Sequence, residues 1–417
     1  MKIDGKTSHN SPSLRFPEFT GEWKEERLSE IADIYKGAGI SKDQLSDNGE
    51  PCILYGELYT KYKTETITEV ISRTDIDNTK LVRSKANDVI IPCSGETAED
   101  IATARCVIKD GILLGGDLNI IRLHNYDGSF VSYQLNGKRK YDIAKVAQGV
   151  SVVHLYGEHL KGVKTVNPYL AEQKIISRFL SLIDERIAVQ SRLIEDLKKL
   201  RCAIIENVFC SPNHNESALR FKGNTDPLST YRMEDFCSRI TRKNKDNQCS
   251  LVLTIAAQYG LVDQESFFNK TVASENLAGY YLLHKGEFAY NRSYSAGYDW
   301  GAVKRLEKYP EGVLSTLYIC FKIDESAVDS DYLAYYFEST KWHKGLSDIA
   351  GEGARNHGLL NVSVNDYFNT RHRFHCMREQ KIIASMLNVI SQKENDEIAL
   401  YDNYQKQKQY LLRKMFI

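Results

Sequence analysis

Apolar residues recur at steps of three and four along one long, uninterrupted stretch of the chain. This stretch runs from about residue 168 to residue 209, and it contains no glycine or proline after Pro168. Gln190 and Arg201 are the polar exceptions on its apolar side. The apolar positions of this stretch are Ile176, Leu180, Ile183, Ile187, Ile194, Leu197 and Ile204. An average spacing near 3.5 residues is typical of a coiled-coil seam. At 1.5 Å per residue, ~35 helical residues span roughly 50 Å. We therefore predict a long helix that acts as a strut rather than as part of a lobe core.

The same pattern returns near the end of the chain. Glu172-Gln173-Lys174-Ile175-Ile176 is repeated as Glu379-Gln380-Lys381-Ile382-Ile383, and the offset of 207 residues holds without a gap to Phe209 and Phe416. The apolar or aromatic positions of the second copy are Ile383, Leu387, Ile390, Tyr401 and Leu411. Glu394 and Glu397 make its middle polar, so we expect the second helix to need the first as its partner. A duplicated element predicts a two-lobed molecule with approximate twofold symmetry.

Mixed regions precede each helix. Short β-like runs alternate there with turns rich in Gly, Asn and Asp. The fold class predicted is α+β, in which two mixed α/β domains alternate with two long helices that pair as an antiparallel coiled coil. The boundaries predicted are an arm at 1–13, a first lobe at 14–167, a central helix at 168–210, a linker at 211–230, a second lobe at 231–375 and a final helix at 376–417.

Composition narrows the class of protein only a little. Hydrophobic residues make up 42% of the chain and charged residues 26%, as in ordinary soluble proteins. The net charge of zero weighs mildly against DNA binding but says little about local patches. No apolar run approaches the ~20 residues that span a bilayer, so no membrane role is expected. Nine single cysteines without a C-x-x-C motif, and no signal peptide, predict reduced thiols in the cytoplasm.

Complete catalytic motifs are absent from the sequence. Gly37-Ala38-Gly39 superficially suggests a nucleotide-binding glycine loop, but no βαβ unit surrounds it and a turn is the better interpretation. There is no Gly-x-x-x-x-Gly-Lys-Ser/Thr phosphate loop and no convincing nuclease carboxylate cluster. His154 and His159 are five residues apart, a spacing that does not place two metal ligands on one helical face. We expect neither catalysis nor a metal or cofactor bound by this chain.

Candidate DNA contacts gather in two segments of the second lobe. Arg239, Arg242, Lys243 and Lys245 lie within eight residues and could contact phosphates, although a solvated surface loop is the plain alternative. Tyr290-Asn291-Arg292-Ser293-Tyr294 combines an amide and a guanidinium that can pair with base edges. The alternative there is that Tyr290 belongs to the core. Further candidates are Lys304 and Arg355 in the second lobe, and Lys36, Lys42, Lys61, Tyr62, Lys63, Ser94 and Thr97 in the first.

Several short motifs together resemble one known family. They are Leu14–Trp23, the two Glu-Gln-Lys-Ile-Ile helix openings, Tyr35–Ile40, Cys52–Glu57, Lys285–Ser293, Gly297–Ala302 and Gly312–Tyr318. With the duplicated helices and the order of lobes, they make the chain similar over essentially its whole length to the specificity subunit of type I restriction-modification enzymes. Two departures stand out. His375-Cys376 precede the second helix where Pro168 precedes the first, and Gly149-Val150-Ser151 stand where the second lobe has Gly353-Ala354-Arg355.

The resemblance implies a non-catalytic subunit that recognises a bipartite target in double-stranded DNA. Each lobe would read one half-site, and the helices would set the spacer and dock two methyltransferase (M) subunits. Motor-nuclease restriction (R) subunits would join through these. S-adenosylmethionine, ATP and magnesium would then belong to the partners. One alternative is a coiled-coil adaptor that joins two proteins without DNA specificity; another is a self-contained enzyme, against which the missing motifs argue.

Overall fold

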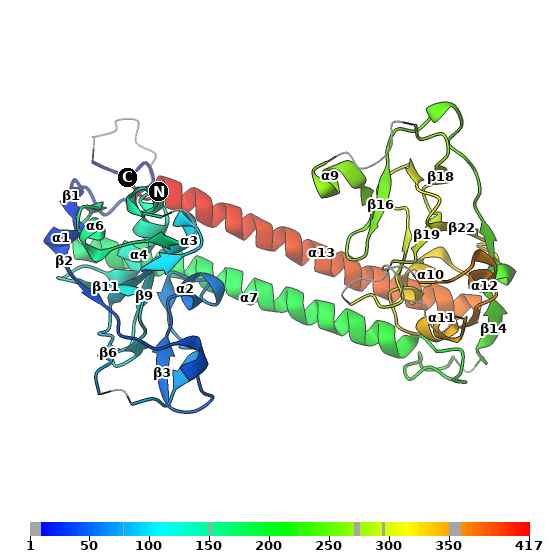
Figure 1. Ribbon diagram of the computed structural model, residues 1–417, viewed down its shortest axis with the longest axis horizontal. Helices are drawn as coiled ribbons and strands as arrows, with labels where there is room; N and C mark the ends of the chain where they lie inside the picture. Colours follow the sequence, from blue (N-terminus) through cyan, green and yellow to red (C-terminus); the bar gives the residue numbers. More distant parts are fainter. Residues whose placement is uncertain are drawn as a thin grey trace. The chain divides into compact units, whose positions relative to one another are not determined.

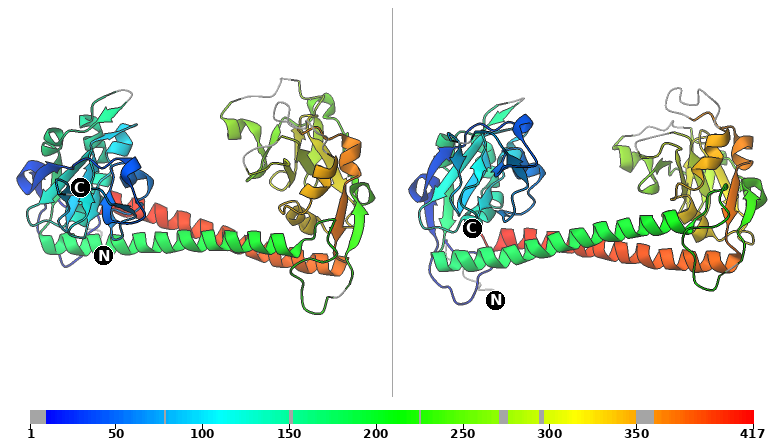
Figure 2. Two further views of the ribbon diagram at one scale, coloured as in Figure 1. Left: turned by 60° about the horizontal axis from the view of Figure 1, so that its bottom comes forward. Right: turned by 90° about the horizontal axis from the view of Figure 1, so that it is seen from below.

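The chain forms two compact units, each built from a lobe and from parts of both long helices. The computed structural model describes residues 10–77, 79–149, 152–224, 226–270, 276–293, 297–349 and 360–417. The first unit comprises Met1–Arg192 with Ala399–Ile417, and the second comprises Leu193–Ile398. The long helices are α7 (Leu170–Val208) and α13 (Met377–Lys414), each continuous (Figures 1 and 2). The predicted mixed α/β composition and the two long helices are confirmed.

Short strands dominate the first unit. Its remaining elements are β1 (Lys24–Arg27), α1 (Leu28–Ile31), β2 (Ala32–Lys36), η1 (Lys42–Gln44), β3 (Glu50–Ile53), α2 (Glu57–Thr60), β4 (Thr66–Ile67), β5 (Ser72–Thr74), β6 (Val82–Arg83), β7 (Asp88–Pro92), β8 (Ser94–Gly95), α3 (Ala98–Ile101), β9 (Arg105–Val107), β10 (Leu113–Leu114), β11 (Leu118–Leu123), α4 (Gly128–Asn136), α5 (Lys140–Val146), β12 (Val153–His154), α6 (Gly157–Lys161) and β13 (Lys164–Asn167).

A five-stranded sheet of order β2-β11-β7-β9-β4 organises this unit, beside a four-stranded sheet of order β5-β3-β10-β6. Strand β11 pairs antiparallel with both neighbours, so that Ile120 lies opposite Tyr35 on one side and Ile90 on the other. The central strand β7 is buried at every position, as its apolar run Val89 to Ile91 requires of a strand covered on both faces.

The ends of both long helices belong to the core of the first unit. Ile176 and Leu180 of α7 pack in one apolar cluster with Phe130 of α4 and with Leu411 and Phe416 at the end of α13. The prediction that the first helix is a strut outside the lobe cores was therefore wrong for its first turns. Those turns carry apolar residues on the side that faces the lobe, and burial of this side stabilises the helix.

The second unit is built from the same kinds of element. They are β14 (Ser229–Arg232), α8 (Met233–Phe236), β15 (Cys237–Arg239), η2 (Lys245–Asn247), β16 (Leu253–Ala256), β17 (Gly260–Asp263), α9 (Gln264–Phe268), β18 (Tyr281–His284), β19 (Phe288–Asn291), β20 (Ala302–Arg305), β21 (Glu311–Leu314), β22 (Ile319–Ile323), α10 (Ser330–Tyr336), α11 (His343–Ile349), α12 (Val364–Phe368) and β23 (Arg371–Phe374).

Its main sheet has the order β15-β22-β19-β20, and three two-stranded sheets surround it. Aromatic side chains fill the core beneath this sheet: Phe288 stacks on Phe321 with ring centroids 5.4 Å apart, and Tyr290 stacks on Tyr367 at 4.7 Å. Ile383 and Leu387 of α13 join this cluster. The second helix therefore also begins inside a lobe core.

Matching contacts attach each long helix to the lobe that precedes it. The Gln173 side-chain oxygen accepts from the backbone amide of Asp127 at 2.9 Å, and that of Gln380 accepts from the amide of Asp329 at 2.8 Å. Asp127 and Asp329 are the N-caps of α4 and α10. The same glutamines donate to the carbonyls of Pro168 and His375, each at 2.8 Å. Since this contact uses only a backbone oxygen, His375 replaces the proline without loss of the anchor.

A second repeat lies in the predicted linker. Leu219-Arg220-Phe221 repeats Leu14-Arg15-Phe16, and both segments lie against the end of a long helix. The amide of Leu14 donates to the carbonyl of Lys414 at 2.9 Å, and the amide of Leu219 donates to that of Asn207 at 2.8 Å. Residues 219–221 therefore start the second lobe's packing in the way that residues 14–16 start the first.

The predicted seam positions differ in burial. The buried ones are Ile176, Leu180, Ile183, Ile194, Ile383, Leu387 and Leu411. Those only half-buried are Ile187, Leu197, Ile204, Ile390 and Tyr401. Within the described ranges, no helix has the length and apolar character to cross a membrane.

Candidate nucleic-acid interface

The basic segment of the second lobe follows β15 and is held by a buried asparagine. The Asn244 side chain is fully buried; it donates to the carbonyl of Cys249 at 2.8 Å and accepts from the amide of Cys249 at 2.9 Å. Lys243 lies 4.2 Å from the ring centroid of Tyr281 and donates to the carbonyl of Gly279 at 2.7 Å. No pattern in the sequence pointed to Asn244, although asparagine is one of the residues whose side chain shapes turns.

The four predicted cations of this segment are all at the surface, with different partners. The Arg239 guanidinium donates to the Tyr281 hydroxyl at 3.4 Å, and that of Arg242 donates to the carbonyl of Leu282 at 3.2 Å and pairs with Glu287. Lys245 is exposed at the start of η2. The structure thus brings Arg239 and Lys243 together around Tyr281, while Arg242 is already neutralised by a carboxylate.

At the end of β19, the structure corrects the predicted DNA contact of Tyr290. Tyr290 is fully buried, stacks on Tyr367 and donates to the carbonyl of Trp300 at 2.9 Å. Burial raises the pKa of its hydroxyl. The alternative interpretation, that Tyr290 belongs to the core, is the one that the structure supports.

Its neighbours hold the loop in shape. The Asn291 side-chain oxygen accepts from the amide of Ser293 at 3.0 Å. Arg292 donates to the carbonyls of Val362 and Leu317, each at 3.1 Å. Lys304 is half-buried on β20. Tyr294 and Arg355 lie outside the described residues.

In the first lobe, two predicted contacts are buried. Tyr62 is 6% exposed, its hydroxyl accepts from the amide of Ile71 at 3.3 Å, and burial raises its pKa to about 12. Ser94 is 8% exposed and donates to Asp117 at 3.3 Å. These two contacts are corrected, because neither side chain can reach a ligand at the surface without a rearrangement. Thr97 is exposed, but its hydroxyl caps α3 by accepting from the amide of Asp100 at 3.1 Å.

The lysines of the first lobe remain available at its surface. Lys36 and Lys42 are exposed, and Lys63 is exposed and donates to the carbonyl of Thr60 at 3.0 Å. Lys42 and Lys61 line one hollow of about 750 Å³ with Gln44 and Tyr55. Lys61 is engaged there by Glu57 at 2.6 Å and by Ser72 at 3.0 Å. A hollow with cationic and amide side chains can accept a phosphate or a base edge.

The glycine run of the first lobe serves close backbone packing. A Cβ on Gly37 would lie 2.0 Å from the carbonyl oxygen of Gly115, and one on Gly116 would lie 3.3 Å from the Cα of Gly39. Gly37-Ala38-Gly39 follows β2 directly and opens no long helix. These observations agree with a turn and not with a nucleotide-binding loop.

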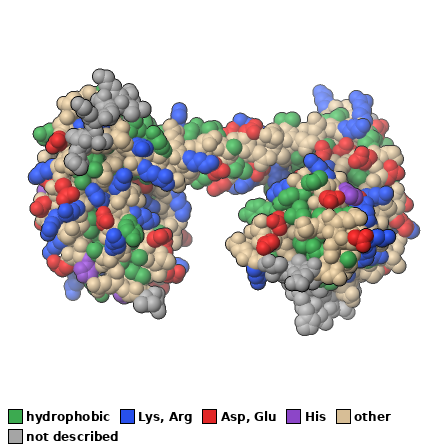
Figure 3. All heavy atoms as spheres, turned by 90° about the horizontal axis from the view of Figure 1, so that it is seen from above, with side chains coloured by type: hydrophobic (Ala, Val, Ile, Leu, Met, Phe, Trp, Pro, Cys, Tyr) green, Lys and Arg blue, Asp and Glu red, His purple; other side chains and the backbone are tan. Residues whose placement is uncertain are grey.

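Charge is mixed over the surface. In the face that Figure 3 shows, Lys and Arg side chains are interspersed with Asp and Glu on each unit. Among the described residues, no three His, Cys, Asp or Glu side chains gather in a group that could hold a metal ion. His154 instead stacks on Tyr156 with ring centroids 6.2 Å apart, and Tyr156 contacts His159 edge-on at 5.6 Å.

Comparison with known proteins relates the first part of the chain to one family. Residues 20–199 match the family model of the type I restriction modification DNA specificity domain. This part of the chain is therefore similar to the specificity domains of that family. The match covers the first lobe from Thr20 and most of α7, and it confirms the resemblance inferred from the short motifs. No curated protein matches the chain.

Solved structures extend the likeness of fold to nearly the whole chain. An S subunit of a type I restriction-modification system from M. genitalium has a TM-score of 0.59 at 15% identity, covering 98% of this chain and 99% of that one. A structure from work on complex assembly and conformational transition of the type I R-M system has a TM-score of 0.53 at 12% identity, covering 94% and 97%. The match at 20–199 therefore lies within a chain whose fold is similar to that of these structures over nearly its whole length.

Proposed function

We propose that the whole chain is the DNA sequence-recognition subunit of a type I restriction-modification complex, in which each lobe reads one half of a bipartite target. The observation that carries the proposal is the match of residues 20–199 to the specificity-domain family model. The second unit repeats its anchors, with Gln380 and Arg220 in the places of Gln173 and Arg15. Arg239, Lys243 and Lys245 of the second lobe, and Lys36 and Lys42 of the first, are the cations that we propose for phosphate contacts.

We propose that α7 and α13 pair as an antiparallel coiled coil that relates the two lobes by an approximate twofold axis. Contacts within the first unit support this direction: Asp184 of α7 meets Lys408 of α13, and Arg186, further along α7, lies 5.8 Å from the ring centroid of Tyr404, further back on α13. The helix pair would act as a ruler for the spacer, because half-sites must follow the DNA repeat of about 10 base pairs.

The partners that we propose are two M subunits docked on the long helices, with R subunits joining through them. An apolar stripe on α7 supports the docking: Ile175, Leu182 and Val189 recur every seven residues and are 39%, 43% and 65% exposed. Such a stripe on a helix surface suits packing against a partner helix. S-adenosylmethionine, ATP and magnesium would be bound by these subunits, and the complex would work in the cytoplasm. The adaptor alternative is not favoured, since the matched domain is a DNA specificity domain.

The test uses the full chain with its methyltransferase partner. Methylated adenines are first mapped in DNA from cells that carry both, which defines a target sequence. The purified complex should then bind a duplex with this target far more tightly than a scrambled duplex, and binding should fall steeply as salt rises. Equal and weak binding to both duplexes would contradict the proposal and favour an adaptor.

A further inference from the structure

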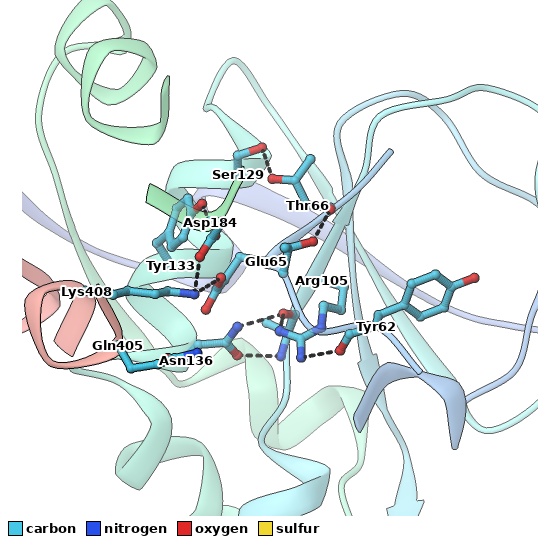
Figure 4. A network of polar contacts seen from close by, with 12 residues as sticks. Tyr62, Glu65, Thr66, Arg105, Ser129, Tyr133, Asn136, Asp184, Gln405 and Lys408 are labelled. Atoms are coloured by element: carbon cyan, nitrogen blue, oxygen red, sulfur yellow. Dashed lines mark hydrogen bonds and ion pairs between the residues drawn. The ribbon is translucent and has the colours of Figure 1, made fainter. Parts of the chain in front are cut away.

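Each unit contains a cation on one long helix that bridges two acids, one on the other long helix and one in the lobe. In the first unit, Lys408 of α13 lies 2.7 Å from Asp184 of α7 and 2.7 Å from Glu65 of the lobe (Figure 4). In the second, the Arg201 guanidinium of α7 lies 3.1 Å from Glu394 of α13 and 2.5 Å from Glu338, which follows α10. We call Lys408 and Arg201 the bridging cations.

The bridging cations occupy one position of the repeat, since the offset of 207 residues that relates the helices also relates Arg201 to Lys408. Their acidic partners on the opposite helix exchange roles, with Asp184 on α7 and Glu394 on α13. Each unit therefore pairs a cation of one long helix with an acid of the other. Only the cations occupy equivalent positions, since the offset of 207 residues relates Asp184 to Ser391.

Near each bridge, a tyrosine of the lobe forms a hydrogen bond with a long helix. The Tyr133 hydroxyl of α4 donates to Asp184 at 2.6 Å, and Figure 4 shows both side chains beside Lys408. The Tyr335 hydroxyl of α10 donates to the side-chain oxygen of Asn388 on α13 at 2.8 Å and lies 3.0 Å from the hydroxyl oxygen of Ser391. Each lobe therefore holds a long helix through a neutral hydroxyl as well as through an acid.

Burial shows why this polar arrangement needs an explanation other than stability. The side chains of Lys408, Glu65 and Asp184 are only 12%, 8% and 6% exposed. Charges withdrawn from water lose solvation, and a set of apolar residues of the same volume is often as stable or more stable. The best-attested use of such buried polar groups between helices is to select one register.

The geometry of the α-helix makes a change of register costly. A slip of one residue turns a side chain by about 100° and moves it away from its partner. A slip of a whole heptad preserves the face but places Tyr401 or Met415 where Lys408 lies, leaving Asp184 without a cation. In the second unit the same slip places Ile194 or Val208 at the position of Arg201. Either heptad slip therefore places an acid opposite an apolar or aromatic side chain in both units.

We infer that Lys408 and Arg201 are positioning residues. They select one register between α7 and α13 and fix the position of each lobe on its helices, and they thereby restrict the target to a single spacer length. The inference rests on the proposed function. The two acids in each bridge belong to different elements, so a shift of the lobe or of the opposite helix breaks the arrangement. The cations need not touch DNA.

The experiment compares the full chain, in complex with its methyltransferase partner, with a variant that removes the first bridge: Lys408→Met and Asp184→Asn together. Glu65 is kept in this double variant because its charge also faces the buried Arg105 guanidinium. The probes are duplexes that carry both half-sites, with the spacer lengthened or shortened by one base pair at a time. Lys406→Met is the matched control, because Lys406 is exposed two residues away on the same helix. Arg201→Met with Glu394→Gln and Glu338→Gln tests the second bridge.

The original chain and the Lys406→Met control should lose about tenfold or more in affinity when the spacer changes by one base pair, as for a misplaced half-site. The double variant should lose less than about threefold while keeping its preference for both half-site sequences. A folded double variant with the original spacer discrimination would overturn the inference and leave the proposed function intact. If the original complex bound no bipartite duplex, the proposed function would fail and the inference with it.

Discussion

Arg15 and Glu172 form a two-point ion pair across 157 residues of sequence, with the guanidinium donating to both carboxylate oxygens at 2.7 and 2.8 Å. Arg220 and Glu379 form the same pair in the second unit. Glu172 and Glu379 are almost completely buried, at 1% and 0% exposure. The first glutamate of each Glu-Gln-Lys-Ile-Ile opening thus attaches the long helix to the Leu-Arg-Phe segment that begins the same unit's lobe.

We expect Arg15→Met to lower the free energy of unfolding of the first unit by about 3 kcal/mol, because it leaves the buried Glu172 carboxylate without its cation. Chemical denaturation followed by circular dichroism measures this change. Lys161→Met is the control: its pair with Glu158 is exposed, so the loss should stay within about 0.5 kcal/mol. Equal effects of the two substitutions would show that the pair is not an anchor.

The pH dependence of the free energy of unfolding should reveal the raised pKa of Asp184. Burial and the nearby charge of Glu65 raise the pKa of Asp184 to about 6 from an ordinary value of 3.8. A carboxyl whose pKa is raised by folding contributes stability that is full below pH 3.8 and is lost as the pH rises through about 6. Lys408 and Arg105, by contrast, hold the pKa of Glu65 below its usual range despite burial.

The stability of Asp184→Asn relative to the original chain should therefore increase between pH 4 and pH 6, by on the order of 1–3 kcal/mol. Urea titrations of both proteins at several pH values measure the difference. A constant difference across this range would contradict a raised pKa at Asp184.

Phosphate contacts by the second lobe should appear in the salt dependence of binding. Lys245→Ala is expected to weaken binding a few-fold on every sequence and to reduce the salt slope by about one, as for the loss of one phosphate contact. Fluorescence anisotropy of a labelled target duplex over a range of salt concentrations measures both quantities. Lys308→Ala is the control in the same lobe, since Lys308 is exposed but lies outside the basic segment. An unchanged slope for Lys245→Ala would remove this residue from the interface.

Substitution of Gly37 by alanine should destabilise the protein, whereas the same substitution of Gly39 should not. Gly37→Ala brings a Cβ to 2.0 Å from the Gly115 carbonyl oxygen, so we expect a loss of about 1–3 kcal/mol from the forced shift of backbone. Gly39→Ala meets nothing within 4 Å and should be neutral or slightly stabilising. Thermal unfolding of the two variants distinguishes them. Equal melting temperatures would show that the close approach is relieved at no cost.

Prediction from the sequence was most accurate where the evidence was periodic or repeated. The 3.5-residue spacing and the offset of 207 residues identified α7 and α13, and the short motifs led to the family that the match at 20–199 confirms. It was weakest for single side chains. Tyr290, Tyr62 and Ser94 were candidate DNA contacts, but they are buried, because side-chain direction in short strands and in the loops between them depends on packing that no local pattern records.

The sequence by itself determined the order of lobes and helices, the equivalence of the two halves and the absence of complete catalytic motifs, since these are properties of spacing and residue type. Only the tertiary structure decided that the long helices begin inside the lobe cores and that residues 219–221 anchor the second lobe. It also showed that Lys408 and Arg201 each meet two acids. Glu65 and Lys408 are 343 residues apart, and only folding can bring such a pair within 2.7 Å.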